Sequence, residues 1–156
     1  MRRHVVVIAA IALESFGCAV ESSLKKEPTH PVMLPGDDVA TRREVAVVLR
    51  EMFGDAGFGL RHAEEAAFVV ANGASGFVVL RWPSGDQSDT ARWIGPMPAG
   101  VVAIVHTHPN WQPLPSNIDI RTAKSSRLPV YVVTRDQISK TAGGSPEIVF
   151  NGDWRR

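Results

Sequence analysis

Two histidines separated by one residue are the first candidates for chemistry in this sequence. His106 and His108 follow a continuous apolar run at 101–105, which is typical of a buried strand. Side chains alternate along a strand with a period of two, so both imidazoles are expected on one face. Neutral imidazoles placed in this way can share one metal ion. Taken alone, a His-x-His pair is weak evidence for such a site.

A carboxylate completes the pattern a few residues later. Ser116 has the character of a helix N-cap, and Asp119 falls in the first turn of a helix expected over about 117–127. The connecting loop is short, so the carboxylate can reach back to the end of the strand. Two histidines and one carboxylate leave the fourth position of a tetrahedral zinc ion open, which is the composition of a catalytic site. Taken alone, Ser116 and Asp119 would more simply indicate a helix cap.

Together, residues 106–119 read His-x-His-Pro-x6-Ser-x2-Asp. This block resembles the signature of the JAMM (JAB/MPN) metalloprotease family. The resemblance covers roughly residues 38–150, although only the 106–119 block is specific, and residues 128–134 are similar to the strand that follows the Asp-bearing helix in bacterial members. It implies a zinc ion bound by His106, His108 and Asp119, and a hydrogen bond from Ser116 to the tetrahedral intermediate.

The family also has a glutamate upstream, on the first strand of its domain and before two small residues. Glu64 and Glu65 both precede such a pair, which here is Ala66-Ala67. Neighbouring side chains on a strand point to opposite faces, so only one of the two glutamates can reach the metal. We favour Glu64. If residues 62–70 were helical instead, both glutamates would be solvated.

The resemblance implies hydrolysis of a peptide or isopeptide bond. Zinc lowers the pKa of its bound water, Glu64 takes the proton, and Ser116 and the metal stabilise the oxyanion. One alternative is a non-catalytic JAB/MPN-like zinc-binding scaffold. Another is a non-haem iron site with the same ligands, against which Ser116 and the family resemblance argue. A cytidine-deaminase zinc site is excluded, because the sequence has no Pro-Cys-x-x-Cys motif.

Hydrophobic periodicity predicts an α/β domain with a mixed sheet flanked by helices, in keeping with the JAB/MPN-like (cytidine-deaminase-like) fold that the resemblance implies. Turn signals place loops over 83–92 and 135–147, and Trp93-Ile94 begins a further short segment. The expected elements are a helix over about 38–53 that stops at Gly54, hairpin strands at 66–71 and 77–82, a central strand at 101–105, the helix at 117–127, and strands at 130–134 and 147–150.

The N-terminus has the features of an export signal. Arg2 and Arg3 precede the apolar run at 5–13, in the order of the charged and hydrophobic regions of a secretory signal peptide. The run is far shorter than the roughly 20 residues that a membrane-spanning helix requires. We therefore predict a signal peptide over 1–17, with a buried N-terminal strand as the structural alternative.

The single cysteine follows directly. Gly17 and Cys18 resemble a bacterial lipobox, in which the cysteine becomes the lipidated N-terminus; cleavage after Ala19 is the alternative. Residues 18–37 contain several prolines and lack apolar periodicity, so we predict a tether there and the JAB/MPN-like domain over 38–156. The lipobox resemblance predicts a lipid anchor at Cys18. It implies a location in the cell envelope, on the periplasmic or extracellular face of a bacterial membrane.

Composition restricts the partners. The chain has 156 residues, which is a one-domain length, and 17 Lys+Arg against 16 Asp+Glu. This balance argues against a nucleic-acid partner, because phosphate binding usually leaves a basic excess. One cysteine excludes an internal disulfide framework and a cysteine-rich zinc site. Export implies an extracytoplasmic substrate, such as a peptide, a protein or a cell-wall peptide.

Overall fold

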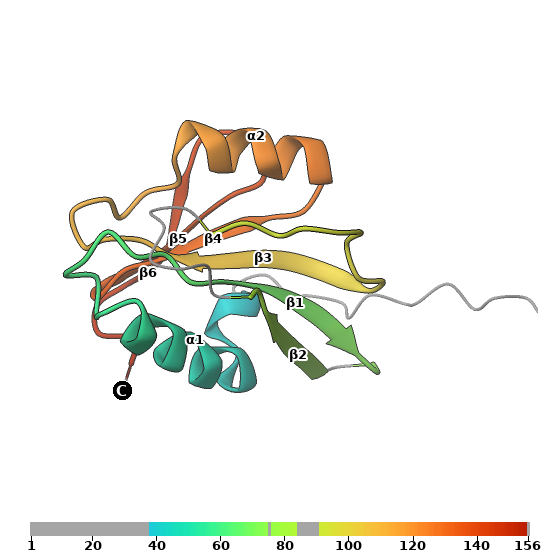
Figure 1. Ribbon diagram of the computed structural model, residues 1–156, viewed down its shortest axis with the longest axis horizontal. Coiled ribbons are helices and arrows are strands. Elements are labelled where there is room, and N and C mark those ends of the chain that lie inside the picture. Colours follow the sequence, from blue (N-terminus) through green and yellow to red (C-terminus); the bar gives the residue numbers. More distant parts are fainter. Residues whose placement is uncertain (1–37, 75, 84–90, 156) are drawn as a thin grey trace, which may run out of the picture.

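The computed structural model describes residues 38–74, 76–83 and 91–155 (Figure 1). The predicted signal peptide, Cys18 and the tether lie outside the described residues. Within the described part, no helix has the length and apolar character needed to cross a membrane.

Among the described residues, six strands form one mixed sheet, in the order β2-β1-β3-β4-β5-β6. Neighbouring strands are antiparallel except for β3 and β4, which are parallel. Helix α1 (Arg43–Asp55) lies on one side of the sheet and helix α2 (Asn117–Ser126) on the other (Figure 1). The predicted α/β architecture is therefore confirmed. The strands are β1 (Ala66–Asn72), β2 (Gly76–Arg81), β3 (Val101–Thr107), β4 (Val130–Val133), β5 (Gln137–Thr141) and β6 (Glu147–Asn151).

Strand β3 is the central element that the apolar run predicted. Ala103 and Val105 are fully buried, and the strand pairs with β1 on one side and β4 on the other. It is longer than expected and continues to Thr107. As a result His106 belongs to the strand itself, in a layer covered on both faces.

The predicted single helix over about 38–53 is wrong at both ends. Asp38 does act as a cap, but its side chain accepts a hydrogen bond from the Ala40 N–H at the start of a short 3-10 helix, η1 (Val39–Thr41). The backbone is extended at Arg42, so α1 (Arg43–Asp55) begins only after this break. Gly54 lies inside α1, since glycine disfavours a helix without forbidding it.

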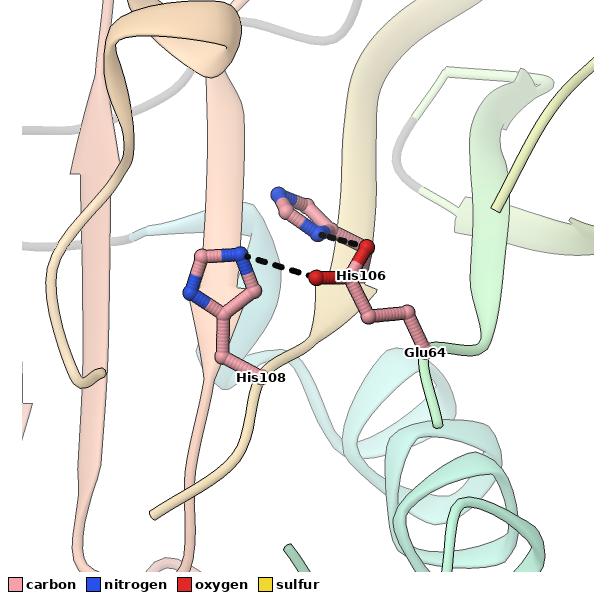
Figure 2. A group of neighbouring side chains, drawn as sticks. All are labelled: Glu64, His106 and His108. Atoms are coloured by element: carbon pink, nitrogen blue, oxygen red, sulfur yellow. Dashed lines mark ion pairs between the residues drawn. The ribbon is translucent and has the colours of Figure 1, made fainter. Parts of the chain in front are cut away.

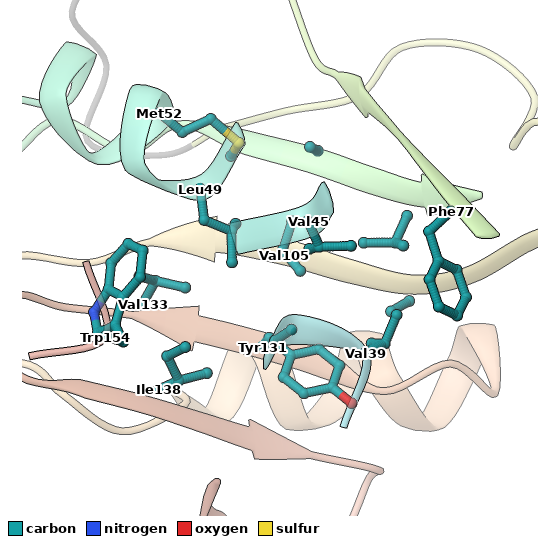
Figure 3. Packing of buried hydrophobic residues seen from close by; sticks show 14 of the residues in the cluster. Val39, Val45, Leu49, Met52, Phe77, Val105, Tyr131, Val133, Ile138 and Trp154 are labelled. Atoms are coloured by element: carbon teal, nitrogen blue, oxygen red, sulfur yellow. The ribbon is translucent and has the colours of Figure 1, made fainter. Parts of the chain in front are cut away.

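The main core lies between α1 and the sheet. Helix α1 presents an apolar face at the 3.6-residue spacing to side chains from the central strands (Figure 3). A smaller cluster lies on the opposite face of the sheet, and α2 (Asn117–Ser126) contributes Ala123 to it. The α1 face consists of Val45, Leu49, Met52 and Phe53, which pack in one cluster with Val105, Tyr131, Val133, Ile138 and Trp154.

The other elements show where sequence patterns succeed and fail. The predicted hairpin is confirmed as β1 and β2, and the strands at 130–134 and 147–150 are confirmed as β4 and β6. The prediction of a turn-rich 135–147 is wrong, because β5 lies within it. Its sequence lacks an apolar run, but Ile138, Ser139 and Thr141 are buried between β4 and β6. Trp93-Ile94 starts no regular element.

Candidate metal centre

Strand β3 presents both histidines on one side of the sheet. His106 is its penultimate residue, and the His108 N–H donates to the Val133 carbonyl oxygen at 2.9 Å, which continues the pairing with β4 past the strand end. The two imidazole centroids are 4.6 Å apart. Both side chains are nearly buried, with exposed fractions of 9% for His106 and 5% for His108. The predicted alternation therefore brings the two rings together.

Asp119 reaches the histidines from the first turn of α2. Its Oδ1 lies 3.1 Å from His106 Nε2, and its Oδ2 lies 3.8 Å from His108 Nε2. Ser116 is the N-cap of this helix: its N–H and its hydroxyl each donate to Asp119 Oδ2 at 2.6 Å, and the Asp119 N–H donates back to Ser116 Oγ at 3.3 Å. Asp119 therefore takes part in the helix cap and also faces the two histidines. Its interpretation as a cap residue and its interpretation as a site carboxylate are both correct.

The electrostatics keep Asp119 ionised. Burial opposes ionisation, but the close approach of His106 and the two hydrogen bonds from Ser116 outweigh it, so the pKa of the Asp119 carboxyl lies well below its ordinary value. A carboxylate is the form that binds a cation.

The surroundings of His108 favour its neutral form. Burial and the neighbouring His106 lower the pKa of His108, against smaller opposite effects of Gln112 and Asp119. Its Nδ1 lies 2.9 Å from the Gln112 carbonyl oxygen. A carbonyl can only accept, so Nδ1 carries the hydrogen, and the Nε2 lone pair faces the carboxylates. A second contact of this kind is what orients a metal-binding histidine.

Glu64 faces the histidines, and Glu65 does not. Glu64 Oε1 lies 3.5 Å from His108 Nε2, and its Oε2 lies 3.9 Å from His106 Nδ1 (Figure 2). The Glu65 carboxylate instead accepts a hydrogen bond from Arg81 at 2.9 Å. The two side chains diverge as adjacent residues of an extended chain do. Both lie just before β1 rather than on it, and β1 excludes the helical alternative for 62–70.

These residues fit a divalent metal ion. Glu64, His106 and His108 each offer one ligand atom, and the three atoms lie within 4.8 Å of one another. His106 Nε2 is buried and has no hydrogen-bond partner in the described part of the chain, because its approach to Asp119 does not meet hydrogen-bond geometry. A cation would satisfy a buried imidazole nitrogen in this state. Imidazole and carboxylate donors suit zinc and other first-row divalent ions.

Asn110 joins three loops beside the site, a role that the sequence reasoning missed. Its amide donates to the Phe58 carbonyl oxygen at 3.0 Å, and its Oδ1 accepts the Arg135 N–H at 2.9 Å. Its backbone N–H donates to the Gly59 carbonyl oxygen at 3.0 Å. Gly59 has a φ of +68°, and a Cβ there would collide with the Asn110 side chain. Asparagine next to the His-x-His-Pro motif gave no signal of these partners.

The loop between the histidines and Ser116 exposes apolar side chains. Trp111 is 54% exposed and Leu114 is 48% exposed. The Trp111 ring meets His62 edge-on at 5.0 Å. These apolar side chains therefore lie at the surface of the segment that connects His108 to Ser116.

The comparison with known families agrees with this geometry. The profile described as prokaryotic homologs of the JAB domain matches residues 59–144, which is more than half of the chain. The match includes Glu64, both histidines, Ser116 and Asp119. The sequence matches no curated protein. The chain belongs to the prokaryotic JAB-domain family.

Proposed function

We propose that the protein is a zinc-dependent hydrolase of amide bonds in peptides or isopeptides. One observation carries this proposal: a carboxylate that precedes β1 faces two histidines at the end of β3, while a second carboxylate from α2 contacts the same two rings. Three elements thus converge on one buried point with the donors of a metal site and one further acid–base group.

The proposal gives each residue of the site either a metal-binding or a proton-transfer role. The ligand atoms of Glu64, His106 and His108 lie within 4.8 Å of one another. The family resemblance instead makes His106, His108 and Asp119 the residues that would hold the ion, with Glu64 as the acid–base group. Zinc in such a site supplies Lewis acidity and a water nucleophile near neutral pH. Glu64 accepts the proton from the attacking water and passes it to the nitrogen of the leaving amine. Its Oε1 lies 3.5 Å from His108 Nε2, so the carboxylate lies beside a ring nitrogen that would bind the ion.

Ser116 has two successive roles in this proposal. Its hydroxyl has one hydrogen, which in the structure goes to Asp119 Oδ2 at 2.6 Å. This bond orients the ligand carboxylate before substrate arrives. To stabilise the oxyanion of the tetrahedral intermediate, the hydroxyl rotates its hydrogen toward the substrate oxygen, while the Ser116 N–H continues to hold Asp119.

The setting of the enzyme is also part of the proposal. The charged and apolar N-terminal regions and the Gly17-Cys18 pair support export and a lipid anchor on Cys18. The protein would then act in the cell envelope on a peptide, a protein or a cell-wall peptide. Because export places the protein outside the cytoplasm, we do not expect a ubiquitin-like substrate.

The test uses the purified full-length protein with zinc, assayed on peptide and isopeptide-linked substrates by detection of the released amine. Glu64→Gln should retain zinc but abolish turnover, because an amide cannot take the proton. Glu51→Gln, on the exposed side of α1, is the matched control and should keep full activity. Full turnover by Glu64→Gln would contradict the proposal. A wild-type protein that binds zinc and cleaves none of these substrates would favour the scaffold alternative.

A further inference from the structure

The segment that carries Glu64 is joined to the histidine-bearing strand through its neighbour, Glu65. The Glu65 N–H donates to Thr107 Oγ1 at 3.0 Å, and the Thr107 N–H donates to the Glu65 carbonyl oxygen at 2.9 Å. Thr107 is the residue between the two histidines, and it is fully buried. Both backbone polar groups of Glu65 therefore end on one residue of β3, although the two are 42 positions apart in the sequence.

The threonine hydroxyl has a specific part in this pairing. Ala66 lies opposite His106 in the β1–β3 register, so Glu65 lies opposite Thr107 one step further on. In a regular antiparallel pair the Glu65 N–H would donate to a backbone carbonyl. Here it donates to the hydroxyl instead, just beyond the start of β1. The Thr107 side chain thus continues the pairing of the two segments by one residue beyond the start of β1.

The Glu65 side chain is fixed as well. Arg81, the last residue of β2, donates from Nη2 to Glu65 Oε2 at 2.9 Å. The same nitrogen lies 2.8 Å from Asp55 Oδ2 at the end of α1. The Glu65 carboxylate is 14% exposed and that of Asp55 is 57% exposed. The pair with Glu65 is better shielded from water, so it is the stronger of the two.

These contacts determine where Glu64 lies. We propose that Thr107 and Arg81 are positioning residues, which hold the Glu64 carboxylate against His106 and His108 by fixing Glu65 at its backbone and at its side chain. The inference rests on the proposed role of Glu64 as the proton acceptor. The position of Glu64 matters for the rate, because a displacement of about 1 Å at a reacting group can lower a rate by about 100-fold.

The first test replaces the hydroxyl. Thr107→Val keeps the shape of the buried side chain and removes the acceptor, while Thr107→Ser keeps the acceptor and removes the methyl group. In crystal structures without added metal, Glu64 should leave His108 in Thr107→Val and return in Thr107→Ser, with the His106–Asp119 contact unchanged in both. With zinc, Thr107→Val should lower kcat by about 10- to 100-fold at an unchanged KM, and Thr107→Ser should restore it.

The second test removes the contacts of the Glu65 side chain instead of those of its backbone. It tests the inference even if Thr107→Val fails to fold. Arg81→Met removes both ion pairs, and Asp55→Asn removes only the exposed one. Arg81→Met should displace Glu64 and lower kcat, whereas Asp55→Asn should do neither. Zinc stoichiometry should stay at the wild-type value in all four variants, because the ligands are untouched.

Two results would overturn the inference. One is a Glu64 carboxylate that stays in place in both Thr107→Val and Arg81→Met. The other is a loss of thermal stability in these variants with kcat unchanged, which is the signature of a purely structural role. The crystal structures also separate this inference from the proposed function. If the wild-type protein has no hydrolase activity, the positions of Glu64 in the variants still show whether Thr107 and Arg81 place it.

Discussion

Ser116→Ala tests the helix cap and the metal centre with one substitution. In the structure the hydroxyl accepts the Asp119 N–H and donates to Asp119 Oδ2, so its removal takes away a cap and a ligand support together. The Ser116 N–H still donates to the carboxylate at 2.6 Å. Asp119 therefore keeps one of its two hydrogen bonds from this residue.

The size of the effect follows from these contacts. Loss of a serine N-cap costs about 1 kcal/mol, and loss of a hydrogen bond to a charged group costs about 1.5–3 kcal/mol. Because Asp119 is only 11% exposed, water replaces little of the second bond. The free energy of unfolding of the metal-free protein should fall by about 2.5–4 kcal/mol. Zinc affinity should fall by about 10–100-fold, as for other groups that orient a ligand.

The assay separates the two roles of the hydroxyl. Urea unfolding gives the stability, competition with a chromophoric chelator gives the zinc affinity, and kcat at saturating zinc gives the oxyanion contribution, expected at about 10²–10³-fold. Ser126→Ala is the control, since its hydroxyl donates to the Thr122 carbonyl oxygen at the other end of α2. A Ser116→Ala protein with lowered stability but wild-type zinc affinity and kcat would refute the assignment, because Ser116 would then be a cap alone.

Four further outcomes are expected. His108→Ala and Asp119→Ala should each lose bound zinc, as measured by metal stoichiometry of the purified protein. The lowered pKa of Asp119 favours folding above about pH 4 and loses this effect as the pH falls, so Asp119→Asn should flatten the acid side of the metal-free stability curve. Leu49→Ala, in the core, should cost about 2–5 kcal/mol of unfolding free energy in urea, while Val47→Ala, 44% exposed on the same helix, should stay within about 0.5 kcal/mol. Cys18→Ser should abolish incorporation of a labelled fatty acid and release the protein from the membrane fraction of producing cells.

The sequence predicts the histidine half of the site well because its geometry is local. A strand end, a short loop and a helix N-cap hold His106, His108 and Asp119, and each of these has a recognisable residue pattern. Glu64 depends on the pairing of β1 with β3, which no local pattern specifies. Alternation could separate Glu64 from Glu65, but only the register shows which one faces the histidines.

The same distinction explains the errors in the fold. Strand β5 has buried polar residues such as Ser139, whose hydroxyl donates to the Pro113 carbonyl oxygen, so its assignment depends on its partners rather than on its own hydrophobicity. The break at Arg42 is invisible to helical periodicity, because apolar residues continue on both sides of it. The parts that were predicted correctly, such as β3 and the β1–β2 hairpin, have apolar runs bounded by turn residues.

The long-range origin of the site has a consequence for the order of folding and metal loading. Glu64 meets the histidines only after β1 has paired with β3, and Asp119 meets them only after α2 has packed against the sheet. Glu64 and His106 are 42 positions apart in the sequence, and a contact between segments so far apart forms only after loop-closure entropy has been overcome. An unfolded chain can therefore offer an ion little more than the two neighbouring histidines. We therefore expect the protein to bind a metal ion at full affinity only after it has folded, so that the completed sheet, rather than the ion, assembles the site.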